Sequence, residues 1–473
     1  MRISVMVFGA FLLSLSLGAS FAQNPPRLVS APNIIPPATE AMQHPEYWIA
    51  RIGPDADKVI MTPEQIRALN LKNRTRPLEM KDINGDPFSI RNLAEKREFY
   101  NIQFYPQDPL MLKPFPGDSL RIGLKKIHDY VAGRKFIDRR RIPFPDEVIK
   151  EILEAIDENA VPSMVKPRYS VIVGNASVRH APYAQRGYSS QDTYLDMLAM
   201  AALEAGSPVA VLHTSKNGDW YYVRAEYLYG WVRAEQVAFG PVQEIRRFSE
   251  PEPFIVSLPH SVPVYGNKEC TVFLTDMYQG TRFRLVNKSS SGYKVLAPFR
   301  RADGRLEAVT GWLKPDADVS AGYQPFTQRN VINTMFRLLY RPYGWQDSEN
   351  ERDCCGILRT VLRTFGIFTP RGTIHELHNT DHVYAFPKGT SKEVKYKYLD
   401  TCEPGITLCG FSGHIVLYLG KVDGVSYVIH SNGYSYHDKD GTEIRIGRVD
   451  VNDTEMEGGS NIGGFTEIST IKP

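Results

Sequence analysis

Two adjacent cysteines, Cys354 and Cys355 in "RDCCG", have the type and position to do chemistry. Apolar residues recur at helical spacing after them, and Gly366 is a favoured helix stop, so we predict a helix that begins near Cys354. These apolar positions are Ile357, Leu358, Val361, Leu362 and Phe365. At a helix N-terminus, unpaired backbone N–H groups and the helix dipole favour a thiolate, which is the nucleophilic form of cysteine. The stretch therefore predicts Cys354 as a nucleophile.

A nucleophilic cysteine needs a base, and two histidines follow in "GFSGHIVLYLGKVDGVSYVIHSNG". The pattern predicts a β-hairpin in which His414 opens the first strand and His430 closes the second. In a hairpin, the residue numbers of each facing pair add up to the same sum. Along each strand, side chains alternate between the two faces of the sheet. Two even-numbered histidines therefore share a face only if that sum is even. A three-residue loop, 422–424, with Gly424 in the left-handed position satisfies this condition and predicts the order nucleophile, base, orienting residue.

The other cysteines and histidines have simpler interpretations. A buried structural thiol is the usual fate of a single cysteine. We interpret Cys270, Cys402 and Cys409 as core residues and leave open a disulfide between the last two. "TIHELHNTDH" contains His375, His378 and His382, but its spacing is H-E-x-H and not the H-E-x-x-H of helical zinc peptidases. We therefore predict a loop near the cleft, with no metal and no other cofactor.

The whole chain has the composition of an ordinary globular protein. The 473 residues carry a formal net charge of +3, which does not favour a nucleic-acid partner. Residues 1–22 have a positive start, an apolar run and small residues before the predicted cleavage site, which is typical of a secretory signal peptide. We predict a periplasmic or secreted protein without a lipid or membrane anchor. In such a compartment the odd cysteine count leaves at least one free thiol.

The regions between the signal peptide and the cysteines are predicted to be structural. Residues 23–44 are rich in proline and are expected to form an extended tail without a core. Residues 45–160 are expected to form a mixed N-terminal domain with two clear helices, one capped by Thr62 and the other in "PDEVIKEILEAIDENA".

A divergent repeat follows, in the segments 167–242 and 252–320. Each copy runs from a glycine through alternating apolar residues, a polar turn and an aromatic strand to a Gly-Trp pair, Gly230-Trp231 or Gly311-Trp312. Short strands with turns at this spacing predict small β-barrels. The pattern resembles tandem bacterial SH3 (SH3b) domains. The alternative is two unrelated β-hairpin regions.

"RDCCG", "SGHIVLYLG" and "VIHSNG" together resemble the NlpC/P60 family of papain-like cysteine peptidases over residues 325–473. The resemblance implies a multidomain fold, with a C-terminal α+β papain-like domain preceded by two all-β SH3b barrels and the mixed N-terminal segment. It also implies an exported endopeptidase that cleaves the γ-D-glutamyl–diamino acid bond of peptidoglycan stem peptides or muropeptides, particularly those with a free N-terminal L-Ala.

The resemblance gives each matching position a role. Cys354 is the nucleophile, His414 the base and His430 the orienting residue. Four substrate-binding positions are implied: Asp353 at the free amine, Tyr343 beside the site, Cys355 in place of the family serine, and Thr373 as a polar lining residue. The family acid before the histidine strand is replaced by Ile406. Neither this change nor Cys355 removes a triad member.

Two other functions are compatible with the same sequence. One is a wall-binding protein whose SH3b domains do the work and whose peptidase domain is idle. The other is a cysteine amidase or acyltransferase on the same fold, because one thioester intermediate serves both water and amine acceptors. The preferred diamino acid and the oligomeric state cannot be deduced from the sequence.

Overall fold

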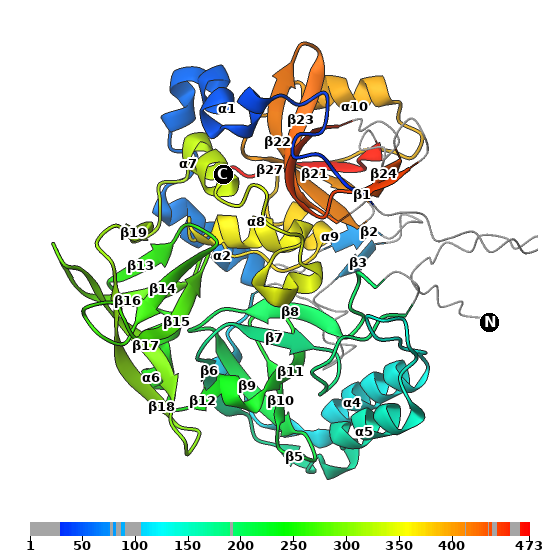
Figure 1. Cartoon of the computed structure of the whole chain (residues 1–473), viewed down its shortest axis with the longest axis vertical. Coiled ribbons are helices and arrows are strands. Elements are labelled where there is room, and N and C mark those ends of the chain that lie inside the picture. The colour runs from blue at the N-terminus through cyan, green and yellow to red at the C-terminus, as the bar shows by residue number, and fades with distance from the viewer. Residues whose placement is uncertain are drawn as a thin grey trace, which may run out of the picture.

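The computed structural model describes residues 29–75, 79–81, 87–89, 106–189, 193–411, 413–433, 435–437, 442–454 and 464–473. The predicted signal peptide, 1–22, lies outside these ranges. Two β-rich units lie below a C-terminal α/β unit in the view of Figure 1, and the helix α8 (Cys354–Arg363) lies between them and the C-terminal sheet. None of the helices in the described ranges is long and apolar enough to cross a membrane.

The two β-rich units are a structural repeat. The first contains β6 (Arg168–Ile172), β7 (Ala176–Arg179), β8 (Ala199–Leu203), β9 (Pro208–Thr214), β10 (Trp220–Arg224), β11 (Tyr229–Arg233) and β12 (Val237–Phe239). The second contains β13 (Phe254–Ser257), β14 (Ser261–Tyr265), β15 (Phe273–Tyr278), β16 (Arg282–Ser289), β17 (Gly292–Arg300), β18 (Leu306–Leu313) and β19 (Val319–Ala321). The sheet orders are β12-β6-β9-β10-β11-β7-β8 and, read from its last strand, β19-β13-β16-β17-β18-β14-β15. Numbered within each unit, the orders are identical, so the unrelated-hairpin alternative is wrong.

The Gly-Trp pairs occupy equivalent places in the two units. A Cβ added to Gly230 would lie 2.4 Å from a methyl group of Val178, and one added to Gly311 would lie 2.5 Å from a methyl group of Val264. Both valines belong to the second strand of their unit, so the same close strand contact requires glycine in each copy.

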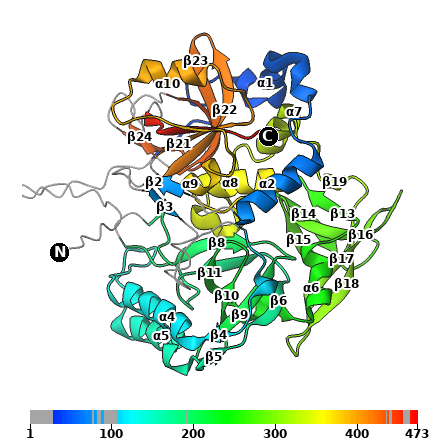
Figure 2. The ribbon, with the colours of Figure 1, turned by 180° about the vertical axis from the view of Figure 1, so that it is seen from behind.

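The predicted N-terminal domain, 45–160, divides between two cores. Helices α1 (Pro45–Ile52) and α2 (Pro63–Thr75) pack with the C-terminal unit, whereas α4 (Gly117–Ala132) and α5 (Asp146–Ile156) pack on the first β-unit. Asn70 of α2 donates a hydrogen bond to the Gly366 carbonyl at 2.8 Å, beyond the end of α8, and Figure 2 shows the two helices side by side. The apolar residues of α1 and α2 are buried in the core of the C-terminal unit, and those of α4 and α5 are buried in the core of the first β-unit. The predicted single N-terminal domain is therefore two separate parts.

One local feature of this segment is confirmed, and short strands complete it. Thr62 caps α2, since its hydroxyl accepts from the Gln65 N–H at 3.3 Å while the Gln65 side chain accepts from the Thr62 N–H at 2.8 Å. The remaining strands before the first β-unit are β2 (Glu79–Lys81), β3 (Pro87–Ser89), β4 (Phe115–Pro116) and β5 (Met164–Val165), and α6 (Val242–Ser249) links the two β-units.

The described part of the predicted tail, from residue 29, is extended but packed. Strand β1 (Val29–Ser30) pairs in parallel with β25 (Glu443–Arg445). The guanidinium of Arg448 donates to the carbonyls of Ala31 and Asn33 at 3.3 and 3.1 Å. The expectation that this segment has no core contact is therefore wrong, because its scattered apolar residues find a buried surface on the C-terminal unit.

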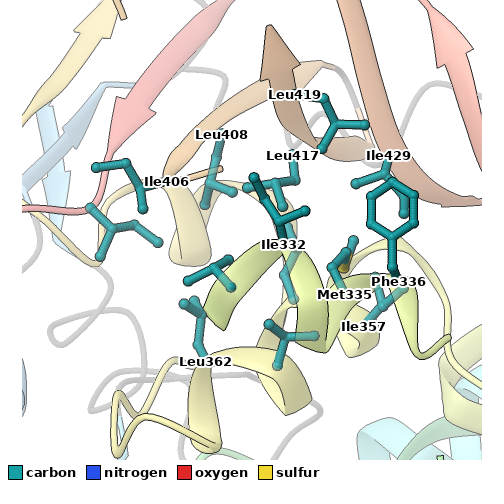
Figure 3. Close-up of a cluster of buried hydrophobic side chains, with 14 of the residues drawn as sticks. Ile332, Met335, Phe336, Ile357, Leu362, Ile406, Leu408, Leu417, Leu419 and Ile429 are labelled. Carbon is teal, nitrogen blue, oxygen red and sulfur yellow. The ribbon is translucent and has the colours of Figure 1, made fainter. Parts of the chain in front are cut away.

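The C-terminal unit is a six-stranded sheet covered on both faces. Its order is β20-β27-β21-β22-β23-β26, with β20 (Val383–Ala385), β21 (Thr407–Phe411), β22 (His414–Val422), β23 (Val425–Asn432), β26 (Arg448–Asp453) and β27 (Glu467–Thr470). On one face α7 (Gln328–Phe336) and α8 pack against Leu408, Leu417 and Ile429 (Figure 3). On the other face Leu399, from α10 (Lys392–Leu399), packs with Val416 and Val428.

The β22–β23 hairpin has a different loop from the predicted one. Val422 pairs with Val425, so the loop is only Asp423-Gly424, and both residues have positive φ, 49° and 82°. The register shifts between Tyr418 and Gly420, so that Leu419 is an extra residue in β22. Beyond this bulge Leu417 faces Ile429, and the sum of facing numbers becomes even. The predicted three-residue loop is wrong, but the bulge supplies the extra residue and puts both histidines on one face.

Candidate active site

The start of α8 is fixed by a side-chain cap. Oδ1 of Asp353 accepts from the N–H groups of Cys355 and Gly356 at 3.1 and 2.8 Å. Gly356 allows a close approach, because an added Cβ would lie 1.8 Å from Oδ1 of Asp347. The helix begins at Cys354, as predicted, because an acidic N-cap satisfies two of its otherwise unpaired amides.

The two thiols lie together at this helix end. Sγ of Cys354 is 3.9 Å from Sγ of Cys355, which is 3.6 Å from Oγ1 of Thr373. Both cysteines are only 6% exposed. The hydrogen bond with Cys354 and then burial raise the pKa of the Cys355 thiol well above its usual value. Cys355 therefore stays protonated, which supports Cys354 as the predicted nucleophile.

Asp353 is more constrained than its predicted role at a substrate amine suggests. Its Oδ2 accepts from the Gln346 N–H at 3.0 Å and from the guanidinium of Arg371, which also bonds Asp347 at 3.1 Å. Arg371 belongs to the "PRGT" stretch, in which only Thr373 was predicted to line the site. Sequence alone could not pair it with Asp353, because the partners are 18 residues apart and meet only when α8 and the loop are packed.

The two predicted histidines form one hydrogen-bonded chain with a third residue. Nε2 of His414 is 2.7 Å from Nδ1 of His430, and Nε2 of His430 is 2.9 Å from Oδ1 of Asn452 on β26. Burial lowers the pKa of His414 well below its usual value and that of His430 to about 4, so both rings are neutral at pH 7.

This chain fixes the tautomers. The amide oxygen of Asn452 only accepts, so Nε2 of His430 carries the proton and Nδ1 accepts from Nε2–H of His414. Nδ1 is then the basic nitrogen of the His414 ring. Asn452 was not predicted, because it belongs to a strand whose pairing with β23 has no local sequence signal.

A hydrogen bond joins the turn before Cys354 to the end of β23, the strand that carries His430. Oγ of Ser431 donates to the Arg352 carbonyl at 2.7 Å. The ring of Tyr343 covers Gly433, where an added Cβ would lie 2.8 Å from the ring. Tyr343 also stacks on Tyr194 of the first β-unit, with ring centroids 5.5 Å apart. Tyr343 therefore lies between the turn before Cys354 and the end of β23. Its role beside the active site and the catalytic roles stay predictions.

Both β-units pack against α8. From the first, Glu204 accepts from Arg359 at 2.5 Å, and from the second, Gln279 accepts from the Thr360 hydroxyl at 2.9 Å. Glu204 and Arg359 were not singled out in the sequence, because nothing local distinguishes a buried charge from an exposed one.

The remaining histidines and cysteines have other partners. His378 contacts Glu467 at 3.0 Å and His382 contacts the Pro473 carbonyl. Burial lowers the pKa of His375 to about 4. The five cysteines all lie in the described ranges and are free, so the disulfide left open between Cys402 and Cys409 is not formed.

We expect the stability of the protein to depend on pH through His430. Its folded pKa of about 4 lies below the 6.5 of the unfolded chain, so the unfolded state binds more protons between these values and stability is lost as pH falls through that window. The slope is up to about 1.4 kcal/mol per pH unit. Burial raises the pKa of the neighbouring Asp450 to about 7, which gives the opposite slope above pH 3.8.

The difference between the wild type and His430→Gln isolates the contribution of this histidine. Chemical denaturation between pH 4 and 6.5 should show a shallower loss of stability on acidification in the variant. Equal slopes in the two proteins would contradict a neutral, buried His430.

A family model and one structural neighbour that spans nearly the whole chain support this organisation. Residues 183–233 match the family model of the SH3 domain of SH3b1 type. The comparison with curated proteins gave no match. Among solved structures, the chain is similar to an NlpC/P60 endopeptidase from Photobacterium damselae subsp. piscicida, with 17% identity and a TM-score of 0.70 over 94% of this chain and 99% of that one. It is also similar to an NlpC/P60 family protein from Bacillus cereus, with 20% identity and a TM-score of 0.46 over 64% of this chain and 100% of that one.

Proposed function

From the NlpC/P60 endopeptidase fold and the SH3b domain of this chain, we propose that it is an exported cysteine peptidase acting on peptidoglycan. Its substrate in this proposal is the γ-D-glutamyl–diamino acid bond of stem peptides, and its location is the periplasm or the medium. The chain from His414 through His430 to Asn452 carries the proposal, because it prepares a neutral base with Nδ1 as the acceptor.

The proposed reaction uses this base twice. Nδ1 of His414 takes the proton of the Cys354 thiol, and the thiolate attacks the γ-D-glutamyl carbonyl. Collapse of the tetrahedral intermediate breaks the amide bond, and the leaving amine takes the proton from His414. Water, deprotonated by His414, then attacks the thioester carbonyl. The carbon–sulfur bond breaks, and the Cys354 sulfur takes the proton back from His414. His430 accepts a hydrogen bond from Nε2 of His414 throughout and orients the ring.

The oxyanion has one natural donor in the first turn of α8. Asp353 already binds the amides of Cys355 and Gly356. We therefore assign the Cys354 amide to the developing oxyanion, which lies next to the attacking sulfur.

Recognition of a free amino end is part of the proposal. The Asp353 carboxylate lies beside Cys354, and the stacked pair Tyr343 and Tyr194 brings the first β-unit to the same end of the site. A charged amine held by a hydrogen bond contributes about 1.5–3 kcal/mol. We expect L-Ala-γ-D-Glu-diamino acid to be cleaved at least about tenfold faster than its N-acetylated form, measured as kcat/KM from product masses.

Asp353→Asn is the matched variant for this prediction. Asparagine also caps helices, so the start of α8 is kept while the charge is lost, and the preference for the free amine should shrink. Equal rates on the two peptides would show that the amino end is not read. Transfer of the glutamyl group to an added amine, visible in the same masses, would favour the acyltransferase alternative.

Catalysis by a thiol and imidazoles predicts independence from metal. A chelator such as EDTA should leave turnover unchanged, and alkylation of the thiols should abolish it. Loss of activity on chelation, with recovery on adding zinc, would contradict this prediction and direct attention to His375, His378 and His382.

A further inference from the structure

The spacing of the two thiols matches that of two ligands on one metal ion, which a single nucleophile does not require. The sulfurs of Cys354 and Cys355 are 3.9 Å apart without a bond between them. A tetrahedral zinc ion with Zn–S bonds of about 2.3 Å holds two sulfur ligands about 3.8 Å apart. The thiols are therefore already spaced as the two arms of a chelate.

A buried carboxyl group without a partner lies on the short helix that begins at the thiols. Glu376 is 1% exposed, and neither of its carboxylate oxygens has a hydrogen-bond partner among the described residues. It is on the short helix α9 (Thr373–Leu377), whose first residue contacts Sγ of Cys355. Burial raises the pKa of Glu376 well above its usual value. A cation at the thiols would stabilise this group in its charged form.

The other charges near the thiols do not oppose a cation. Arg371 is paired with Asp347 and Asp353, so its charge is compensated. Asp353, Cys354 and Cys355 are also the only set of three or more His, Cys, Asp or Glu side chains in the described ranges whose donor atoms lie within 4.8 Å of one another. Asp353 can keep its place as the helix cap, because the chelate needs only the two sulfurs.

We propose that Cys354 and Cys355 form a bidentate site for a soft divalent metal ion such as Zn²⁺ or Cd²⁺, with Glu376 as the nearby carboxylate. Binding replaces the two thiol protons, which leave to solvent, with two metal–sulfur bonds. Because the metal competes with protons, binding tightens as pH rises. The bound ion occupies the nucleophile, so it inhibits hydrolysis. Only this inhibition rests on the proposed function.

Cd²⁺ is the direct probe, because thiolate coordination gives it an ultraviolet charge-transfer band. Titration of the full-length protein should show one ion per chain. Cys354→Ser and Cys355→Ser should each weaken binding by at least about 100-fold, the upper end of the loss seen when a supporting contact is removed from a metal site, and Glu376→Gln by about tenfold.

Cys402→Ser is the matched control. Cys402 and Cys409 are the other two cysteines that lie in one cluster, and removing one of them should leave the titration unchanged. A titration lost in Cys402→Ser and retained in Cys355→Ser would assign the ion to that cluster and overturn the proposal.

A second measurement needs no variant and no substrate. In the wild-type protein, Zn²⁺ should protect Cys354 and Cys355 from alkylation, read by mass spectrometry of their shared peptide, while the partly exposed Cys270 continues to react. Unprotected alkylation at saturating Zn²⁺ would overturn the site whatever the enzyme activity. A protein that binds the ion without cleaving stem peptides would keep the metal site and contradict only the proposed function.

Discussion

Cys354→Ala is expected to lower kcat for stem-peptide hydrolysis by on the order of 10⁴-fold or more, as loss of a nucleophile does in enzymes that work through a covalent intermediate. Cys355→Ser should retain turnover. The two cysteines are adjacent, equally buried and in contact, so composition and exposure do not distinguish them. Their environments do, because Cys355 is held as a thiol between Cys354 and Thr373.

His414→Ala provides the parallel test, and it should cost a similar factor, because residues that act as one unit are not additive. Thermal unfolding of each variant checks that the site is intact before rates are compared. A Cys354→Ala protein with appreciable turnover, or a Cys355→Ser protein as inactive as Cys354→Ala, would contradict the assignment of the nucleophile.

Glu204→Ala is expected to lower the free energy of unfolding by about 3–5 kcal/mol, the cost of removing one partner of a buried ion pair. Glu204 and Arg359 are each 1% exposed, and Arg363 lies 3.5 Å from the same carboxylate. Burial raises the pKa of Glu204, but the two arginines outweigh it and lower the pKa to about 2. The stabilisation is therefore complete above the unfolded value near 4.5 and is lost as pH falls toward 2.

Two variants make this prediction specific. Glu244→Ala breaks the exposed pair with Arg247 and should change stability by less than about 1 kcal/mol. The double variant Glu204→Leu, Arg359→Met removes both charges of the pair and should recover part of the loss, because Arg363 keeps Glu226 and Asp347 keeps Arg371 as a partner. Denaturant titration at pH 7 measures all three. A loss below about 1 kcal/mol for Glu204→Ala would mean that the first β-unit is not held to α8 by this pair.

Several features were determined by the sequence itself. The helix start at Cys354 depends on an acidic cap, a glycine and apolar residues at helical spacing, all within a few positions. The β-repeat depends on alternation, turns and Gly-Trp pairs that recur at equivalent places. The apolar run after His414 placed it correctly at the start of its strand, whereas the second strand continues past His430 to Asn432. These signals are local, so the physics that creates each element acts between residues that are neighbours in the sequence.

The hairpin marks the limit of such reasoning. The prediction that His414 and His430 share a face of the sheet was correct, but the three-residue loop predicted to bring this about was wrong. The Asp-Gly pair favours a two-residue turn with both residues left-handed, and this local preference prevailed. The parity was then restored by a bulge at Leu419, whose side chain is buried with α7 and α8. The strand carries a local signal for the bulge in Gly420, which follows Leu419 and has a positive φ of 124°.

Only the tertiary structure decided which distant groups complete the site. Asn452 reaches His430 through strand pairing, Arg371 reaches Asp353 through the packing of a loop on α8, and Glu204 reaches Arg359 across two structural units. The N-terminal segment likewise divides between two cores that its own sequence does not specify. A buried polar group needs a partner, and a local sequence can show the need for one. The identity of that partner depends on which surfaces meet in space, since the energy that selects it comes from contacts between residues far apart in the chain.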